Sequence, residues 1–332
     1  MIELAKISDT DDILEFVKKN WDRNHIFIKK PELMLWQHLV KKKGYLNFVI
    51  AKNKKKSIVG LQGLISKNLS LSNFGNDNLW LALWKIDKKK AEKKALGMEL
   101  LDFVIEKFKP KSMCSVGINK KVEILFKLMG FKTGMMKQYY IKSNFKSKFS
   151  NHINRDFNII KKKKDIINIK KININKLTDF NFFDKDKSIK YFKHRFQNHP
   201  FYKYFVLEIK NCTNKEKLRI IVREINFSNE KIWRVVDISN SNINKFYNPI
   251  FFSKYLFKNK VSYIDFLIND ECKEIPLKLG FTLRKENIFL PHHFEPFENK
   301  IINVSYCYKI FDKRKLYSVF KSDGDFDRPS II

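Results

Sequence analysis

Residues 87–97 form a basic segment whose composition suits phosphate binding. An apolar run, Leu79 to Ile86, is followed by Asp87-Lys88-Lys89-Lys90-Ala91-Glu92-Lys93-Lys94 and then by Gly97. A strand that enters a helix through such a loop leaves several backbone N–H groups without helical partners, and an anion is favoured there. The segment therefore predicts a phosphate cradle. The alternative is a generic strand–helix–strand crossover with a solvated lysine face.

The elements that position this loop follow from hydrophobic spacing. The apolar run at 79–86 is too short for a core helix, which indicates a buried strand. The next apolar residues share one face of a helix, which Lys109-Pro110 ends: Gly97, Leu101, Val104, Ile105 and Phe108. Residues 112–118 indicate a second strand. Asn119 then opens a further helix, and Gly130 ends it in the left-handed conformation.

The segment after this second strand carries a spaced pattern: Asn119, Val122, Leu125, Phe126, Gly130 and Phe131. This pattern resembles the Asn-x-x-Ala-x-x-Leu-Tyr-x-x-x-Gly-Phe motif of the GNAT acetyltransferase superfamily. Ala95-x-Gly97 is similar to the end of that family's pyrophosphate loop, Arg/Gln-x-x-Gly-x-Gly/Ala. The resemblance implies an acyl-CoA cosubstrate and no metal.

The resemblance also implies a cofactor site with two parts. In the family the cofactor strand and the next strand splay apart, and the pantetheine arm lies in the gap, bonded to main-chain groups. Backbone N–H groups at the start of the following helix hold the diphosphate. The residues expected to bind the cofactor are Leu83, Trp84, Lys85, Lys93, Lys94, Ala95, Gly97, Asn119 and Phe126.

Three residues depart from the family pattern. Glu92 replaces an Arg or Gln, and we expect its carboxylate to turn away from the diphosphate while nearby lysines supply the positive charge. Ala95 replaces a glycine but can still present its N–H group if its φ is negative. Phe126 replaces a tyrosine that protonates the departing thiolate in many family members. This general acid is therefore absent or supplied elsewhere.

Aromatic and basic side chains in both halves are candidates for the acceptor site. In the family, the first helices cover the acceptor side of the cleft. The candidate residues are Trp21, Trp36, Arg195, His199 and Tyr202. Each is also compatible with an ordinary position at the edge of a core. The acceptor amine must lose a proton to become acylated, and His25 and Asp237 are the candidate general bases.

The second half of the sequence repeats a Gly-Phe pair that ends a helical segment in the first half. Leu279-Gly280-Phe281 follows a helical segment as Met129-Gly130-Phe131 does, and strands are expected at 205–210, 218–226, 231–239 and 261–268. The basic loop does not recur, because Ser239-Asn240-Ser241-Asn242 follows the corresponding strand.

We therefore expect an α/β (α+β) protein made of two GNAT-like domains, each a mixed, mostly antiparallel sheet flanked by helices. Residues 1–143 form the expected acyl-CoA-binding domain, and 144–178 form a connection. Residues 179–332 form the second expected domain, with a degenerate cofactor loop and a candidate acceptor site.

Composition limits the remaining functions. The 332 residues carry a formal net charge of +32, but lysines are spread along the whole sequence. A nucleic-acid footprint should be a patch or stripe, so nucleic acid is not expected as a partner. The cysteines Cys114, Cys212, Cys272 and Cys307 lack Cys-x-x-Cys spacing, which favours reduced thiols in a cytoplasm. Neither a signal segment nor an apolar run of membrane-spanning length is present, so a soluble protein is expected.

The expected function is transfer of an acyl group, most simply acetyl, from acyl-CoA to an amine. The whole chain resembles tandem GNAT-like proteins encoded among bacterial surface-polysaccharide genes. That resemblance suggests an amino sugar or its nucleotide-linked form as the acceptor. Three alternatives stay open: aminoacyl transfer from charged tRNA, as in peptidoglycan-type enzymes, a catalytically inactive binding protein, and a general nucleic-acid binder.

Overall fold

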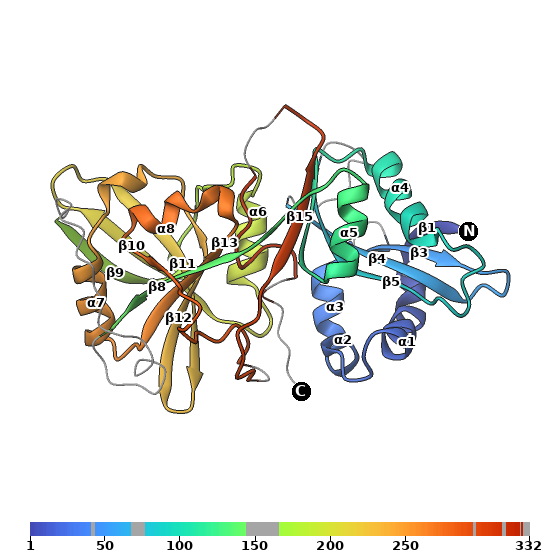
Figure 1. Ribbon diagram of the computed structural model, residues 1–332, viewed down its shortest axis with the longest axis horizontal. Coiled ribbons are helices and arrows are strands. Elements are labelled where there is room, and N and C mark those ends of the chain that lie inside the picture. Colours follow the sequence, from blue (N-terminus) through green and yellow to red (C-terminus); the bar gives the residue numbers. More distant parts are fainter. Residues whose placement is uncertain are drawn as a thin grey trace. The chain divides into compact units, whose positions relative to one another are not determined.

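The computed structural model describes residues 1–40, 44–67, 77–143, 166–294, 297–313, 317–325 and 327. The chain divides into two compact units, which appear in Figure 1. The first unit comprises Met1–Thr133, Cys307–Lys315 and Asp323–Ile332. The second unit comprises Gly134–Tyr306 and Leu316–Ser322.

The first unit is built on a mixed sheet with the strand order β1-β3-β4-β5-β6-β15-β7 and with β2 beside β3. Its strands are β1 (Ile2–Lys6), β2 (Leu39–Val40), β3 (Tyr45–Lys52), β4 (Ile58–Ser66), β5 (Asn78–Ile86), β6 (Ser112–Ile118), β7 (Lys132–Met135) and β15 (Ser305–Ile310). Strands β1, β3, β4 and β5 pair antiparallel in that order, whereas β5 and β6 are parallel. The buried strand expected at 79–86 is therefore confirmed as β5.

Helices cover both faces of the first sheet. They are α1 (Thr10–Asn20), α2 (Ile26–Lys29), α3 (Pro31–His38), α4 (Leu96–Phe108) and α5 (Lys120–Leu128). Figure 1 shows α4 and α5 on one face and α1 to α3 on the other. Leu100, Leu101 and Val104 of α4 are fully buried in one cluster with Val49 and Leu81. The apolar stripe expected on this helix therefore packs against the sheet.

The second unit is also a mixed sheet flanked by helices. Its strand order is β14-β8-β13-β12-β11-β10-β9. The strands are β8 (Lys137–Lys142), β9 (Ile167–Asn173), β10 (Tyr204–Asn211), β11 (Lys217–Phe227), β12 (Glu230–Ile238), β13 (Tyr263–Ile268) and β14 (Thr282–Leu283), and the helices are α6 (Ile189–Phe192), α7 (Pro249–Lys258) and α8 (Glu274–Lys278). Strands β12 and β13 are parallel, and their neighbours pair antiparallel. The expected class, two mixed sheets flanked by helices, is confirmed.

Two strands do not follow the domain ranges expected from the sequence. Strand β8 lies within residues 1–143, yet it pairs with β13 and β14 of the second sheet. Strand β15 lies between β6 and β7 of the first sheet, although it belongs to the range 179–332. Hydrophobic spacing identifies a buried strand but not its partner, because pairing depends on contacts distant in sequence. In the expected connection at 144–178, residues 144–165 lie outside the described residues, and β9 follows them.

Both units end a helix in the same way before a strand. Gly130 has a φ of +77° and Gly280 a φ of +89°. The amide after each glycine donates to the carbonyl five residues earlier: Phe131 N to Phe126 O and Phe281 N to Pro276 O, both at 2.9 Å. This is the Schellman bond, which needs a left-handed residue at the glycine position. The repeated Gly-Phe pair therefore marks the same local structure in both units.

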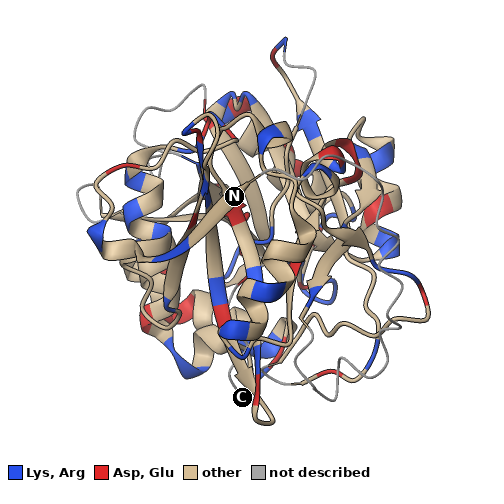
Figure 2. Cartoon of the chain, turned by 90° about the vertical axis from the view of Figure 1, so that its left-hand side faces the viewer, with Lys and Arg blue, Asp and Glu red and all other residues tan. Residues whose placement is uncertain are grey.

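Charged side chains of both signs occur on all kinds of secondary structure in the described residues. In the view of Figure 2, lysines and arginines lie on helices, strands and loops, with acidic residues between them. Within the described ranges, no helix combines the length and apolar character needed to cross a bilayer. The same residues contain no group of three or more His, Cys, Asp or Glu side chains that could hold a metal ion.

Candidate functional site

Strands β5 and β6 pair over only part of their length. Parallel pairing runs from Asn78 to Trp80 on β5 and from Ser112 to Cys114 on β6, whereas the strands continue to Ile86 and Ile118. We call the unpaired part of these two strands the first splay. Across it the described residues place one hydrogen bond, from Ser115 Oγ to Leu81 O at 3.1 Å. The resemblance implied a separation of two strands at this place in the sequence, for the pantetheine arm.

Strand β5 bulges at the first splay. The register of β4 against β5 shifts at Gln62, which faces both Leu83 and Trp84. Leu83 has a φ of +49°, a conformation that is uncommon for residues other than glycine. Gln62 Nε2 holds the bulge by donating to Ala82 O at 2.9 Å. A bulge disrupts the ladder locally and redirects main-chain groups, so the amides near Leu83 are released from regular pairing.

The start of α4 supplies unpaired backbone N–H groups. Ala95 is the N-cap residue, with a φ of −89° and no side-chain capping bond. The backbone N–H groups without an acceptor among the described residues are those of Lys93, Lys94, Ala95 and Gly97. Such donors, together with the positive end of the helix dipole, favour an anion. The negative φ that the sequence required of Ala95 is observed.

Charged side chains surround this helix start. Glu92 is exposed and borders a cavity of about 310 Å³ whose lining also includes Met1, Ala51 and Leu96. Glu92 therefore lies on the side of α4 that faces β1 and β3. Lys93 Nζ pairs with a Glu99 oxygen at 3.1 Å, while the Lys94 side chain is exposed.

Trp84 links the first splay to both helices. A Cβ atom added to Gly97 would lie 3.2 Å from the indole Cζ2, so the ring rests directly on the start of α4. The Trp84 ring centroid is 5.3 Å from that of Phe126 on α5. The indole Nε1 is buried and has no hydrogen-bond acceptor among the described residues. A buried donor without an acceptor costs about 1–3 kcal/mol, which a ligand oxygen would offset.

The remaining expected cofactor residues, Asn119 and Phe126, have structural roles in α5. Asn119 accepts a hydrogen bond from Val122 N at 3.0 Å, so it caps α5. Phe126 is 1% exposed and contacts Phe131, with ring centroids 4.7 Å apart. Its phenyl ring offers no hydroxyl for proton transfer.

A series of rings lies on the face of the first sheet covered by α1 to α3. Consecutive ring centroids are 4.1–6.3 Å apart along the series Trp21, His25, Phe27, His38 and Phe48. Phe27 and Phe48 were not singled out from the sequence, because their spacing along the chain follows no motif. Lys85 Nζ lies 5.9 Å from the Trp21 ring centroid and so connects the series to the end of β5. Trp36, on α3, is partly buried.

His25 has a structural bond in this series. Its Nδ1 accepts the Phe27 N–H group at 3.2 Å and thereby caps α2. The neutral ring therefore carries its proton on Nε2. A ring nitrogen that caps a helix is not available to take a proton from an amine. The geometry favours a structural role for His25.

The second unit brings together Arg195, His199 and Tyr202. His199 Nδ1 accepts the Tyr202 N–H group at 2.9 Å, and the two rings stack with centroids 5.1 Å apart. Arg195 Nη1 donates to the Tyr204 hydroxyl at 2.9 Å. Burial, with the charges of Arg195 and Arg223, lowers the pKa of His199 to about 2. His199 is therefore neutral at all physiological pH values.

Asp237 lies at the end of β12 in a buried ion pair. Lys187 Nζ is 2.6 Å from its Oδ2, and both side chains are 0% exposed. Ser322 Oγ and the Ile238 N–H group also donate to this carboxylate. These donors stabilise the charged form and occupy its oxygens. The arrangement does not favour Asp237 as the base for an acceptor amine.

His293 gives the second unit an expected sensitivity to acid. Burial lowers its pKa from the usual 6.5 to about 4, and the charges of Lys321 and Arg234 add to this effect. The unfolded chain binds the proton more tightly, so the stability contributed by neutral His293 is lost as the pH falls from about 6.5 towards 4. We expect the urea midpoint to fall over this range, and to fall less in His293→Gln. Identical pH profiles for the two proteins would contradict the assignment.

Comparisons with known proteins identify the architecture. No protein-family model matches the sequence, and no curated protein matches it. A GCN5-related N-acetyltransferase from Anabaena variabilis matches with a TM-score of 0.56 at 9% identity, over 94% of this chain and 73% of its own. The chain has the GNAT fold.

Two further solved structures with this fold match the chain. A GCN5-related N-acetyltransferase from Kribbella flavida gives a TM-score of 0.51 at 7% identity, over 94% of this chain and 71% of its own. A probable N-acyltransferase from Enterococcus faecalis gives 0.50 at 8% identity, over 93% and 72%. At these identities the GNAT fold is shared, and the chemistry must be argued from the site.

Proposed function

We propose that this protein is an N-acyltransferase that moves an acyl group from acyl-CoA to an amine. The observation that carries the proposal is that β5 leaves β6 at Trp80 and then leads into a helix start with unpaired N–H groups. An acyl-CoA needs an open strand edge for its pantetheine arm and an anion site for its diphosphate. Strand β5 and the loop after it offer both in one continuous stretch of chain.

The residues present at the site fit an acyl-CoA. The N–H groups of Lys93, Lys94, Ala95 and Gly97 suit the diphosphate, and the exposed Lys94 side chain adds positive charge. The buried Trp84 Nε1 suits an oxygen of the arm. A side chain at Gly97 would press on the Trp84 ring, because an added Cβ atom would lie 3.2 Å from the indole Cζ2.

The reaction itself is a simple acyl transfer. The amine nitrogen attacks the thioester carbonyl, a C–N bond forms, and the C–S bond breaks with the electron pair leaving on sulfur. Main-chain N–H groups near the bulge at Leu83 would stabilise the oxyanion that forms on the way. The proton lost by the amine goes to water, and water returns one to the thiolate, since Phe126 has no hydroxyl to donate.

For the acceptor we propose an amino sugar, free or linked to a nucleotide. Trp21 is 45% exposed and has Lys85 Nζ 5.9 Å from its ring centroid. An exposed indole beside a cation suits a sugar ring that carries an anionic group nearby. The role in surface-polysaccharide synthesis rests on the resemblance of the whole chain, and a panel of amino sugars with acetyl-CoA tests it directly.

Glu92→Gln is expected to strengthen acyl-CoA binding about three- to tenfold, because it removes one exposed negative charge beside the diphosphate site. Calorimetric titration with acetyl-CoA measures the change. Glu106→Gln is the matched control, since Glu106 is an exposed carboxylate near the far end of α4, away from the diphosphate site. Equal affinities for Glu92→Gln and Glu106→Gln would count against the assigned position of the diphosphate.

His25→Asn is expected to retain activity within a few-fold of the parent protein. The asparagine oxygen replaces Nδ1 as the acceptor for Phe27 N, while the Nε2 atom is lost. Steady-state rates with acetyl-CoA and the best amine provide the comparison. A loss of about 10²-fold or more, at unchanged stability, would instead make His25 the general base.

If the donor is a charged tRNA, the protein should bind tRNA and should not turn over acetyl-CoA. This alternative requires retention of the protein on immobilised tRNA at moderately high salt. Thermal stabilisation by acetyl-CoA, with loss of tRNA binding as the salt rises, supports the acyl-CoA enzyme. Absence of stabilisation by every acyl-CoA tested would leave a binding protein without this activity.

A further inference from the structure

The second unit contains a splay of its own. Parallel pairing runs from Ile232 to Val235 on β12 and from Tyr263 to Phe266 on β13, while β12 continues to Ile238 and β13 to Ile268. The register of β12 against β11 also shifts at Val236, directly after the last residue that pairs with β13. We call the unpaired ends of β12 and β13 the second splay. It repeats the bulge and the strand separation of the first splay.

Residues 317–322 cross the second splay and bond to both of its strands. The Ser322 N–H group donates to Val236 O, on β12, at 3.2 Å. On the other side, Asn269 N, directly after β13, donates to Val319 O at 3.3 Å. Where β12 and β13 separate, their main-chain groups lose each other as partners and could bind a ligand. Residues 317–322 bond to these groups instead.

Side chains of this segment are also buried. Val319, Phe320 and Ser322 are all 0% exposed. Phe320 forms a bridge with Ile268 and stacks on Phe266, with ring centroids 6.1 Å apart. The second splay is thus filled by an apolar ring and closed by hydrogen bonds.

The buried ion pair described above holds the same segment. Asp237 Oδ2 accepts from Lys187 Nζ at 2.6 Å and from Ser322 Oγ at 3.1 Å. The Lys187 ammonium also lies 4.8 Å from the centroid of the Phe320 ring. Removing residues 317–322 from the splay would expose Phe320 and take one donor from a buried carboxylate, which is costly.

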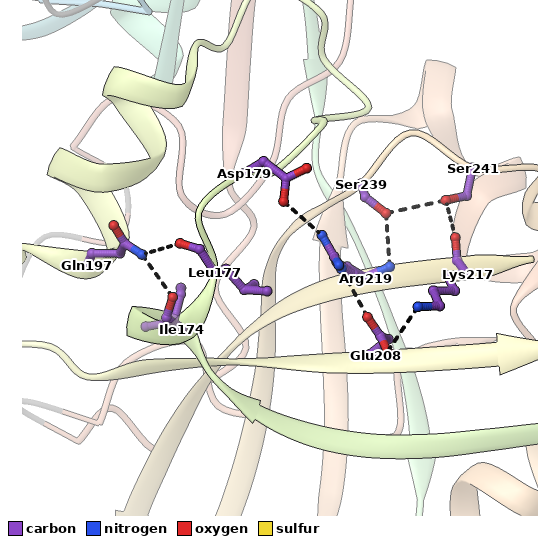
Figure 3. A network of polar contacts seen from close by, with 9 residues as sticks. All are labelled: Ile174, Leu177, Asp179, Gln197, Glu208, Lys217, Arg219, Ser239 and Ser241. Carbon is purple, nitrogen blue, oxygen red and sulfur yellow. Dashed lines mark hydrogen bonds and ion pairs between the residues drawn. The ribbon is translucent and has the colours of Figure 1, made fainter.

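The first two amides after β12 already have acceptors. The Ser239 N–H group donates to Arg219 O and the Asn240 N–H group to Asn181 O, both at 2.8 Å. Figure 3 shows the side chains that hold this loop: Arg219 N donates to Ser239 Oγ at 2.9 Å, and Ser241 Oγ donates to Lys217 O at 2.7 Å. These two amides therefore cannot cradle a phosphate. The start of α7 is also capped, because Asn248 Oδ1 accepts the Phe251 N–H group at 3.0 Å, whereas the start of α4 has no side-chain cap.

We propose that residues 317–322 take, in the second splay, the place that the pantetheine arm takes in the first. The second unit then binds no acyl-CoA, and each chain binds one. The inference rests on the proposed function for its account of the first splay. In this proposal Asp237, Lys187 and Ser322 hold residues 317–322 in the second splay.

Two measurements test the proposal. Calorimetric titration of the full chain with acetyl-CoA is expected to give one site per chain, and Ala95→Asp should weaken that site. Two sites per chain, or one site that Ala95→Asp leaves unchanged, would overturn the proposal.

Hydrogen exchange decides the point even if acetyl-CoA does not bind at all, an outcome that would remove the proposed function. The Ser322 amide is expected to exchange as slowly as the paired amides of β12, with and without saturating acetyl-CoA. Rapid exchange of this amide in the free protein, or faster exchange when acetyl-CoA is added, would show that the segment does not occupy the second splay permanently.

Discussion

Ala95→Asp is expected to stabilise the protein while weakening its binding of acetyl-CoA about 10- to 100-fold. Ala95 is an N-cap without a side-chain bond, and aspartate at such a position contributes about 1 kcal/mol over alanine. The same carboxylate takes N–H groups intended for the diphosphate and adds a like charge. Loss of one charge-assisted hydrogen bond, at about 1.5–3 kcal/mol, accounts for the expected change in affinity.

Ala95→Asn provides the control for this first prediction. Asparagine caps the helix about as well as aspartate but carries no charge, so the melting temperature should rise similarly and the affinity should fall less. Differential scanning calorimetry and titration with acetyl-CoA give the two quantities. Tight binding by Ala95→Asp, in a protein that has become more stable, would place the diphosphate elsewhere.

Asp237→Asn is expected to lower the free energy of unfolding by about 3–5 kcal/mol, because it leaves the Lys187 ammonium buried without its counter-charge. Urea denaturation measures this change. A catalytic base would behave differently: the variant would keep its stability and lose about 10²–10⁴-fold in rate. The two roles of Asp237 are therefore separable by one pair of experiments.

The double replacement Lys187→Met with Asp237→Leu is the matched control. Removing both charges of a buried pair is often nearly neutral, because the desolvation cost of both ions disappears together. We expect the double variant to be more stable than Asp237→Asn alone. If the double variant were less stable than Asp237→Asn, the ion pair would not be the cause of the destabilisation.

Local sequence patterns predicted the parts of the site that depend on neighbouring residues. The strand at 79–86, the helix that includes Gly97, the Asn119 cap and the left-handed Gly130 are each determined by spacing or by a residue's own conformational preference. The negative φ of Ala95 also follows from local helix geometry. These features lie within one continuous segment, so the sequence contains what is needed to recognise them.

Features that depend on distant residues could not be read in this way. Asp237 was a candidate base within the strand expected at 231–239, but Lys187 is 50 positions away and nothing in the spacing marks the pair. The same holds for β8 and β15, whose sheets are set by non-local pairing. Residues 317–322 carry no motif, and only their bonds to Val236 and Asn269 reveal their place in the second splay.

The most direct test of the account is the nitrogen-15 NMR signal of the Trp84 indole during titration with acetyl-CoA. The chain contains 5 tryptophans, and Trp84→Phe assigns the resonance. Trp233 Nε1 already donates to Glu224 at 3.0 Å in the second unit and serves as the internal reference. We predict a saturable shift of the Trp84 signal with the Trp233 signal unchanged. A Trp84 signal that does not move at saturating acetyl-CoA would contradict the placement of acyl-CoA in the first splay.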